Sequence, residues 1–254
     1  HHPTAGSVLE WCFLDRANQS SVLNCLGAAR DNARTARHLL TNDSWEALNG
    51  AWIEMQGWHD RVAVEAHGGW EDACAWATRQ CLLVRGAFLE LPRDQLPQVI
   101  TMGQMIERLA FTATVLQMSP ITRSGEIECW PGSSLQRRTE AALAAAGGID
   151  TFGRGDRGGV CPAAVVNFLL GDPVSPRSLL VCSRAIVECI VGLTDGESVH
   201  HARSLPAARD LVDRVCAAYE GRVEIVAAMA GIVTSIFGLS GIIARDHFEP
   251  ASAA

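Results

Sequence analysis

Three arginines in residues 25–40 have the spacing of one helical face. Arg30, Arg34 and Arg37 follow one another at intervals of four and three residues, which places their side chains on the same side of an α-helix. Like charges in that arrangement repel one another by about 0.2–0.5 kcal/mol per pair, so the pattern needs a reason. A carboxylate or phosphate held between the planar guanidinium groups is one explanation. The alternative is a solvated face, on which Asp31 pairs with Arg34.

Glu107 and Arg108 form a second candidate site, within the apolar stretch MIERLAFTATVL at 105–116. A carboxylate on an apolar helix face needs a charged or hydrogen-bonding partner. An arginine of the first group is the natural partner, because buried charges persist only when they are paired. We therefore predict that Arg30, Arg34 and Glu107 form one connected polar cluster, either as a structural network or as a functional site.

Other catalytic constellations find little support. Glu46 stands three residues after Asp43, the spacing of a capping box, and is a weaker candidate for a catalytic acid. A di-iron site needs two Glu-x-x-His motifs and two further glutamates, whereas the chain has one clear instance, at 197–200. No nucleophile elbow, phosphate loop or catalytic-cysteine signature occurs. We expect no metal and no cofactor on this chain.

The composition is that of a globular, acidic protein. A chain of 254 residues with 48% hydrophobic content is long enough to bury a core in one large or two small domains. The formal net charge of -7 argues against a nucleic-acid-binding surface. The nine cysteines include no CxxC pair and no close Cys/His cluster, which argues against a disulfide framework or a zinc site. Buried thiols in a cytoplasmic protein are the expectation.

One segment has the length and composition of a membrane span. Residues 225–244 contain no charged side chain, and about twenty apolar residues suffice to cross a bilayer. Three glycines within it, Gly231, Gly238 and Gly241, suit close helix packing, and no basic cluster or aromatic belt flanks the segment. We therefore expect a core helix that is surrounded on all sides. A membrane anchor is the alternative.

The elements that must position these residues are predicted to be helices throughout. Apolar positions recur at spacings of three and four, and no stretch alternates as a strand does. The predicted fold class is therefore all-α. The ranges with this pattern are 7–40, 43–58, 70–90, 98–118, 133–147, 162–170, 176–193, 205–221 and 223–246.

An internal repeat organises the chain. Residues 7–29 align with residues 164–186 at a constant offset of 157 and without a gap. Each copy is predicted to be a helix, a capped turn and a second helix, with Asn18 and Ser175 as N-caps and Pro176 at the first helical position. The identical pairs are Val8/Val165, Asp15/Asp172, Ser21/Ser178, Leu23/Leu180, Cys25/Cys182 and Ala28/Ala185.

The repeat predicts a helical bundle built from two duplicated multi-helix repeats, the first incomplete. Residues 1–92 would form the first repeat and residues 93–254 the second, packed as one domain. The counterpart of residues 98–163 would precede residue 1, so we expect a missing N-terminal segment. Large exposed apolar patches are unusual on monomers. The face formed by 7–40 and 162–193 is therefore expected to pack on another chain, as in a homo-oligomer, or on a swapped element.

Three segments resemble the alpha-E domain family of bacterial all-helical proteins, namely 20–49, 93–116 and 165–182. The family pattern AREN-AR appears at 29–34 with Asp31 in place of glutamate, and E-x-W-E-x-L-N appears at 43–49 with Asp43 in place of its first glutamate. The helix LGR-x-x-ERAD-x-T is represented by Gly103, Glu107, Arg108 and Thr112, with Gln104 and Ala110 replacing its first arginine and its aspartate. The phrase D-x-x-FPRS is represented by Asp172, Pro176, Arg177 and Ser178.

The resemblance implies a role beside circularly permuted ATP-grasp and transglutaminase-like proteins. The chain would be an accessory or substrate-carrying component of a peptide amide-ligation or peptide-modification system, with a peptide as a possible ligand and ATP bound by its ligase partner. An autonomous amide hydrolase or transferase and a purely structural interaction protein are the alternatives. The residues that would bind substrate or an anion are Arg30, Asn32, Arg34, Arg108 and Arg177, and the catalytic candidates are Glu107 and Glu46.

Overall fold

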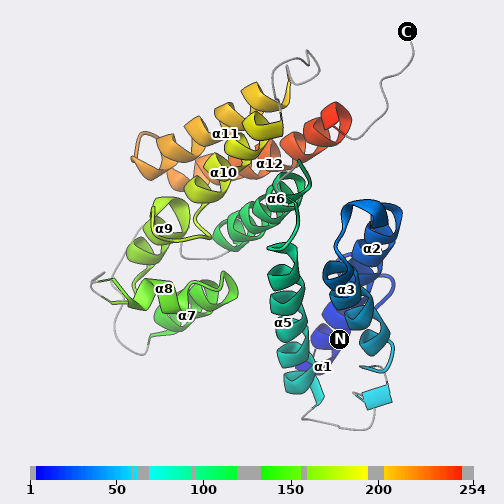
Figure 1. The fold of residues 1–254 in the computed structure, drawn as a ribbon. Coiled ribbons are helices and arrows are strands. Elements are labelled where there is room, and N and C mark those ends of the chain that lie inside the picture. Colours follow the sequence, from blue (N-terminus) through cyan, green and yellow to red (C-terminus); the bar gives the residue numbers. More distant parts are fainter. Residues whose placement is uncertain are drawn as a thin grey trace. The chain divides into compact units, whose positions relative to one another are not determined.

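The computed structural model confirms the all-α fold class (Figure 1). The structure describes residues 4–58, 60–61, 69–92, 95–118, 133–155, 159–193 and 203–247, and these ranges contain helices and turns but no strand. The chain divides into two compact units, residues 1–97 and 98–254. Each unit is described by itself below. The packing of the two predicted repeats as one domain stays a prediction.

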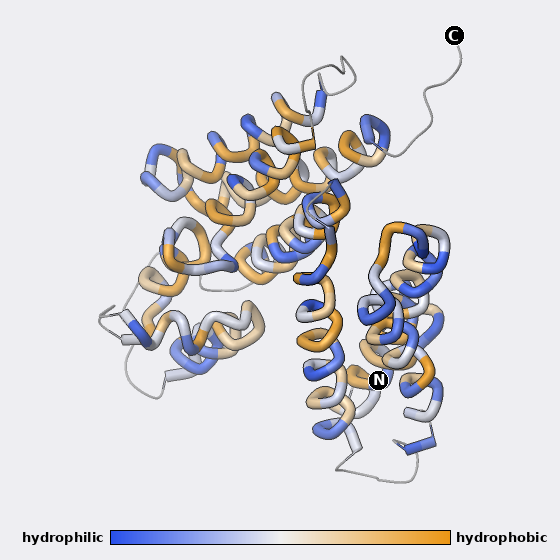
Figure 2. The backbone as a smooth tube through the Cα atoms, in the orientation of Figure 1, coloured by the Kyte–Doolittle hydropathy of each residue, from blue (hydrophilic) through white to orange (hydrophobic). Residues whose placement is uncertain are grey.

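Unit 1 is a small helical bundle around a cluster of aromatic rings. Its helix α2 packs on α3, and α3 packs on α5. Phe13 at the end of α1 lies edge-on to Trp58 and Trp70, with ring centroids 6.4 and 6.1 Å apart, and Trp76 of α5 completes the cluster. Figure 2 shows hydrophobic and hydrophilic residues alternating along α5, as in an amphipathic helix. The elements are α1 (Ala5–Phe13), α2 (Val22–Thr35), the 3₁₀ helix η1 (Arg37–Leu39), α3 (Asn42–Met55) and α5 (Gly69–Phe88).

Helix α2 ends earlier than the sequence pattern suggests. Its last residue is Thr35, and Arg37 begins the separate turn η1. The Arg37 guanidinium donates to the Leu40 carbonyl oxygen and to Oδ1 of Asn42, at 3.2 and 2.6 Å. The expectation of three arginines on one continuous helical face is therefore wrong, and only Arg30 and Arg34 belong to α2.

The predicted capping box of α3 is also wrong. The N-cap is Thr41, whose hydroxyl oxygen accepts the backbone N–H of Ser44 at 3.2 Å. Asp43 and Glu46 lie inside the helix, and the side chain of Glu46 is exposed. The Ser44 hydroxyl reaches the Ala87 carbonyl oxygen at 3.1 Å, so the start of α3 is tied to the end of α5.

Unit 2 contains a larger apolar core, with α9 at its centre. Five residues of α9 are at most 4% exposed: Val165, Val166, Phe168, Leu169 and Leu170. Helix α9 is packed by α7, α10 and α11, and α11 is packed in turn by α12. The elements are α6 (Gln95–Met118), which crosses the unit boundary, then α7 (Ser134–Ala145), α8 (Ile149–Gly153), α9 (Pro162–Gly171), α10 (Leu179–Leu193), α11 (Ser204–Tyr219) and α12 (Ile225–His247).

Helix α12 is not surrounded, contrary to the expectation from its sequence. One face is buried through Met229, Ile232, Ile236, Leu239 and Ile243, whereas Phe237 on the other face is 64% exposed. Most of the exposed residues between 225 and 244 are small, among them Ala227, Ala230 and Gly238, so this part of the helix is uncharged without being enclosed. It is also the one helix in the described ranges that is long and apolar enough to cross a membrane. The cytoplasmic location stays a prediction.

The two aligned segments fold alike, one in each unit. In both, an aspartate at the helix end accepts a backbone N–H two residues later at 2.8 Å: Ala17 to Asp15 and Val174 to Asp172. In both, the second helix begins directly after a serine, at Val22 in α2 and at Leu179 in α10. The predicted succession of helix, turn and helix is confirmed for both segments. A duplication as its origin stays a prediction.

The predicted N-caps of these second helices are three residues too early. Ser21 and Ser178, not Asn18 and Ser175, accept the backbone N–H of the residue three positions later, at 3.3 and 3.2 Å. Asn18 instead accepts the backbone N–H of Ser20 within the turn, at 3.0 Å. Pro176 therefore lies in the turn and not at the first helical position.

Candidate functional site

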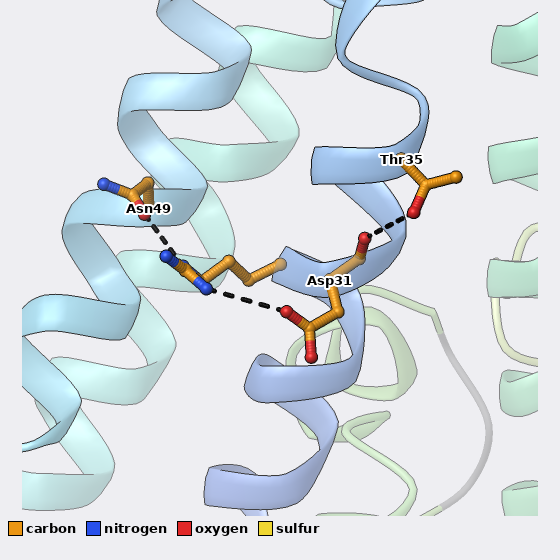
Figure 3. A network of polar contacts seen from close by, with 4 residues as sticks. Asp31, Thr35 and Asn49 are labelled. Carbon is orange, nitrogen blue, oxygen red and sulfur yellow. Dashed lines mark hydrogen bonds and ion pairs between the residues drawn. The ribbon is translucent and has the colours of Figure 1, made fainter.

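Arg30 of α2 reaches across to α3 of unit 1, where its partner Asn49 is labelled in Figure 3 together with Asp31 and Thr35 of α2. Its Nε atom donates to Oδ1 of Asn49 on α3 at 2.8 Å, and its Nη1 atom lies 3.6 Å from Oδ1 of Asp31. The Thr35 hydroxyl donates to the Asp31 carbonyl oxygen at 3.1 Å. The Arg30 side chain is 28% exposed. Arg30 therefore connects α2 to α3 while part of its side chain stays exposed.

The other two predicted binding residues of α2 lie on its surface. Asn32 and Arg34 are exposed. Arg34 lies in the last turn of α2, where a positive charge is favoured by the partial negative charge of the helix C-terminus. Arg30 and Arg34 thus differ in surroundings although they share a helix and a charge.

This difference predicts unequal effects of the same substitution. Arg30→Lys should lower the free energy of unfolding by about 0.5–1.5 kcal/mol, because lysine lacks the Nε donor that reaches Asn49. Arg34→Lys is the matched control and should change it by less than about 0.5 kcal/mol. Urea denaturation followed by circular dichroism measures both. Equal losses in the two variants would contradict the role assigned to Arg30.

In unit 2, two predicted binding residues come together around one buried thiol. Cys182 on α10 is 0% exposed, and its thiol donates to the Pro176 carbonyl oxygen at 3.7 Å. Burial raises the pKa of Cys182 to about 11, while the positive charges of Arg108 and Arg177 act in the opposite direction. Both arginines are half-buried. Residues far apart in the sequence therefore form one positively charged region next to the start of α10.

The turn that carries Arg177 is fixed from two sides. The hydroxyl of Thr112, which is 2% exposed on α6, donates to the Arg177 carbonyl oxygen at 3.1 Å. Gly147 has a φ of +63°, and a Cβ atom added there would lie 2.9 Å from Cζ of Arg177. The Arg177 guanidinium therefore lies against the backbone of Gly147, in a place that only glycine leaves open. Helix α6 and the turn after α7 together position this arginine.

The hydrogen bond from α6 to this turn yields a second prediction. Thr112→Val removes the hydroxyl and leaves the Arg177 carbonyl oxygen without this donor, so unfolding should become easier by about 1–3 kcal/mol. Thr114→Val is the control on the same helix, because the Thr114 hydroxyl donates to the Ala110 carbonyl oxygen of its own helix, at 2.8 Å. Its loss should stay below about 1 kcal/mol. Similar losses of unfolding free energy in both variants, measured by thermal and urea denaturation, would argue against a stabilising hydrogen bond between Thr112 and the Arg177 carbonyl oxygen.

The two catalytic candidates are both exposed. Glu107 lies on α6 in unit 2, and Glu46 lies on α3 in unit 1. Arg30 and Arg34 belong to unit 1, so the proposed cluster of these arginines with Glu107 joins side chains of different units. That cluster stays a prediction.

A groove of about 740 Å³ opens on unit 1, and most of its lining residues belong to segment 7–40, part of the apolar face that was expected to pack on another chain or a swapped element. What covers it stays a prediction. It lies between α1, the turn after it and the end of α3. Trp11, Leu14, Leu23 and Met55 supply its apolar lining, and the polar lining comes from Ser7, Glu10, Asp15, Arg16 and Gln56. The internal repeat is the sequence feature that bears on this surface. At the offset of 157 it pairs Trp11, which lines the groove, with Phe168, which is buried in the core of unit 2.

Metal and thiol chemistry have few candidates in the described ranges. No group of three histidine, cysteine, aspartate or glutamate side chains there could hold a metal ion. The Glu-x-x-His instance at 197–200 lies outside the described residues. Among the cysteines that the structure describes, only Cys182 and Cys189 are buried, so the expectation of generally buried thiols is wrong.

Comparison with known proteins assigns the chain to a family. The family model of Alpha-E, described as a predicted alpha-helical domain with a conserved ER motif, matches residues 1–248. The chain belongs to the Alpha-E family. No curated protein and no solved structure matches the chain significantly. The resemblance seen in the sequence is therefore confirmed over nearly the whole length of the chain.

This Alpha-E chain contains one Glu-Arg dipeptide, Glu107–Arg108. Its two side chains have different surroundings. Arg108 is half-buried, and its positive charge lowers the pKa of Cys182, whereas Glu107 is exposed. One turn further along α6, Thr112 bonds the turn that carries Arg177. The arginine of this dipeptide is thus part of the region that joins α6 to α10, and the glutamate is accessible from solvent.

Proposed function

We propose that this Alpha-E chain is an accessory or substrate-carrying component of a peptide amide-ligation or peptide-modification system. An ATP-grasp ligase would bind ATP and form the bond, while this chain would hold the ligase, the peptide or both. The observation that supports the proposal is the groove of unit 1, which offers an apolar lining with Glu10, Asp15 and Arg16 to a peptide or protein. Grooves that combine apolar walls with a few polar groups are typical of binding sites.

The competing enzyme hypothesis is an amide hydrolase or transferase that uses Glu107. A carboxylate that acts as a general acid or base is usually tuned by burial or by a neighbouring charge. Glu107 is exposed to solvent on α6 and is not enclosed by the core of unit 2. In the described part of unit 2, Arg108 and Arg177 near Cys182 form an arrangement that an anionic substrate would match. We therefore prefer the accessory role.

Reconstitution tests the accessory role. The chain is purified together with the products of its neighbouring genes, and amide formation is measured with ligase, ATP and peptide, with and without the chain. We expect co-purification with the ligase and faster amide formation when the chain is present. Amide cleavage or transfer by the chain alone, lost in Glu107→Gln, would overturn the proposal in favour of an enzyme. If the chain neither co-purifies with the ligase nor accelerates amide formation, a structural interaction protein is the better description.

A further inference from the structure

The Arg177 side chain is held in place, yet its guanidinium has no hydrogen-bond acceptor in the described part of the chain. The half-buried side chain lies against the backbone of Gly147. The hydrogen bonds of Arg177 involve its backbone: its N–H donates to Oγ of Ser175 at 3.4 Å, and its carbonyl oxygen accepts from Thr112 at 3.1 Å. An arginine side chain carries five N–H donors. Those of Arg177 are therefore left to solvent or to a ligand.

Two other arginines of unit 2 show the contrast. Arg214 donates to Asp210 at 2.6 Å, and Arg222 donates to Glu220 at 2.7 Å. Both arginines are exposed, so water also stabilises their charge. Arg177 is more buried than either and has no carboxylate partner in the described ranges. Because removing a charge from water is unfavourable unless the charge is paired, a bound anion would stabilise this position.

Arg108 brings a second positive charge to the same region. It precedes Thr112 by one turn of α6, so both residues lie on the side of this helix that faces the turn of Arg177. The charges of both arginines act on the Cys182 thiol. Asp172 is the acidic residue of this turn, and its Oδ1 atom accepts two backbone N–H groups there, at 2.8 and 3.2 Å. Like charges in a half-buried region repel each other, and an anion between them relieves that repulsion.

We propose that Arg177 and Arg108 bind the C-terminal carboxylate of a peptide. The two oxygens of a carboxylate match two parallel N–H donors of a guanidinium group. Because Gly147 and Thr112 already fix the position of Arg177, little conformational freedom is lost when the anion binds. This inference rests on the proposed accessory role, since it names the part of the peptide that the chain holds. A phosphate offers oxygens of the same kind, and the experiment separates the two sources.

The test titrates the full chain with N-acetyl-alanyl-alanine, with the C-terminal amide of this peptide and with inorganic phosphate. NMR follows the Nε–H signals of the arginines, and the Arg177 signal is the one that Arg177→Lys removes. This signal should shift saturably with the free acid, with a dissociation constant of about 1 mM or lower. The amide should bind about tenfold more weakly or worse, because it lacks the negative charge.

Arg177→Lys keeps the positive charge but loses the paired donors. Its affinity for the free acid, followed through the Arg108 signal, should therefore fall about tenfold. Arg184→Lys is the matched control, because Arg184 is exposed on α10, the helix that follows Arg177. Its affinity should equal that of the unsubstituted chain. Circular dichroism verifies that both variants remain folded.

Three outcomes would overturn the inference. The first is equal affinity for the free acid and the amide, and the second is equal affinity in Arg177→Lys and Arg184→Lys. The third is tighter binding of phosphate than of the free acid, which would make phosphate the ligand. These failures differ from failure of the accessory role. A chain that accelerates amide formation equally well with Arg177→Lys keeps the role and loses the site, whereas carboxylate binding without acceleration keeps the site and loses the role.

Discussion

Gly171→Ala should lower the free energy of unfolding by about 1–3 kcal/mol, the usual cost of forcing one extra carbon into a packed core. Gly171 is the last residue of α9, and a Cβ atom there would overlap Cγ and Cδ2 of the Tyr219 ring on α11. The ring cannot avoid this contact by moving its outer atoms alone, because Cγ is the atom that attaches it to the side chain. Urea denaturation followed by circular dichroism measures the loss.

A glycine on the surface of another helix supplies the control for this variant. Gly103 is exposed on α6, and a Cβ atom there would meet no other atom within 4 Å. Gly103→Ala should therefore stabilise the chain by about 0.4–1 kcal/mol, through the lower entropy of the unfolded state. In a Tyr219→Ala background, Gly171→Ala should cost almost nothing. An undiminished cost in that background would show that the ring is not the cause.

The order of the helices was predictable because it depends on local patterns. Apolar spacing and turn residues located every described helix longer than two turns, and the internal repeat predicted the turn that separates α1 from α2. The N-caps were harder: the segment DRANQSS contains Asp15, Asn18 and Ser21, each of which is able to accept a backbone N–H. The structure uses all three, the first two within the turn and the third for α2. The sequence contains the acceptors but not their assignment.

The candidate sites were less predictable because they depend on tertiary contacts. Arg108 and Arg177 meet at Cys182 only through the packing of α6 beside the start of α10. The groove depends on tertiary contacts in a different way. Trp11 and Phe168 occupy equivalent positions in the repeat, and the residues around each have the pattern of an apolar helix face. Whether such a helix face is buried depends on the helices that pack on it, as α7, α10 and α11 pack on α9. The sequence of α1 carries no information about which helices pack on α1.

The stability of the chain should fall as the pH rises from about 9 to 11, because of Cys182. Burial raises the pKa of this thiol from its ordinary value of 9.0 to about 11 in the folded chain. Between these values the unfolded chain has lost the proton and the folded chain still holds it. Stability then decreases by up to about 1.4 kcal/mol per pH unit from this one group. Below pH 9 the contribution is fully present.

The composition of the chain makes this slope measurable. It contains no lysine and a single tyrosine, so the side chains that titrate in the same range are mainly its nine cysteines. Urea denaturation at pH 7, 9, 10 and 11 with a reductant present should show a shallower slope for Cys182→Ala than for the unsubstituted chain. Burial also raises the pKa of Cys189, which accounts for a remaining slope. Cys81→Ala, which removes an exposed thiol, is the matched control for the loss of one cysteine. An identical slope in Cys182→Ala and the unsubstituted chain would mean that the thiol beside Arg108 and Arg177 is not shielded from water.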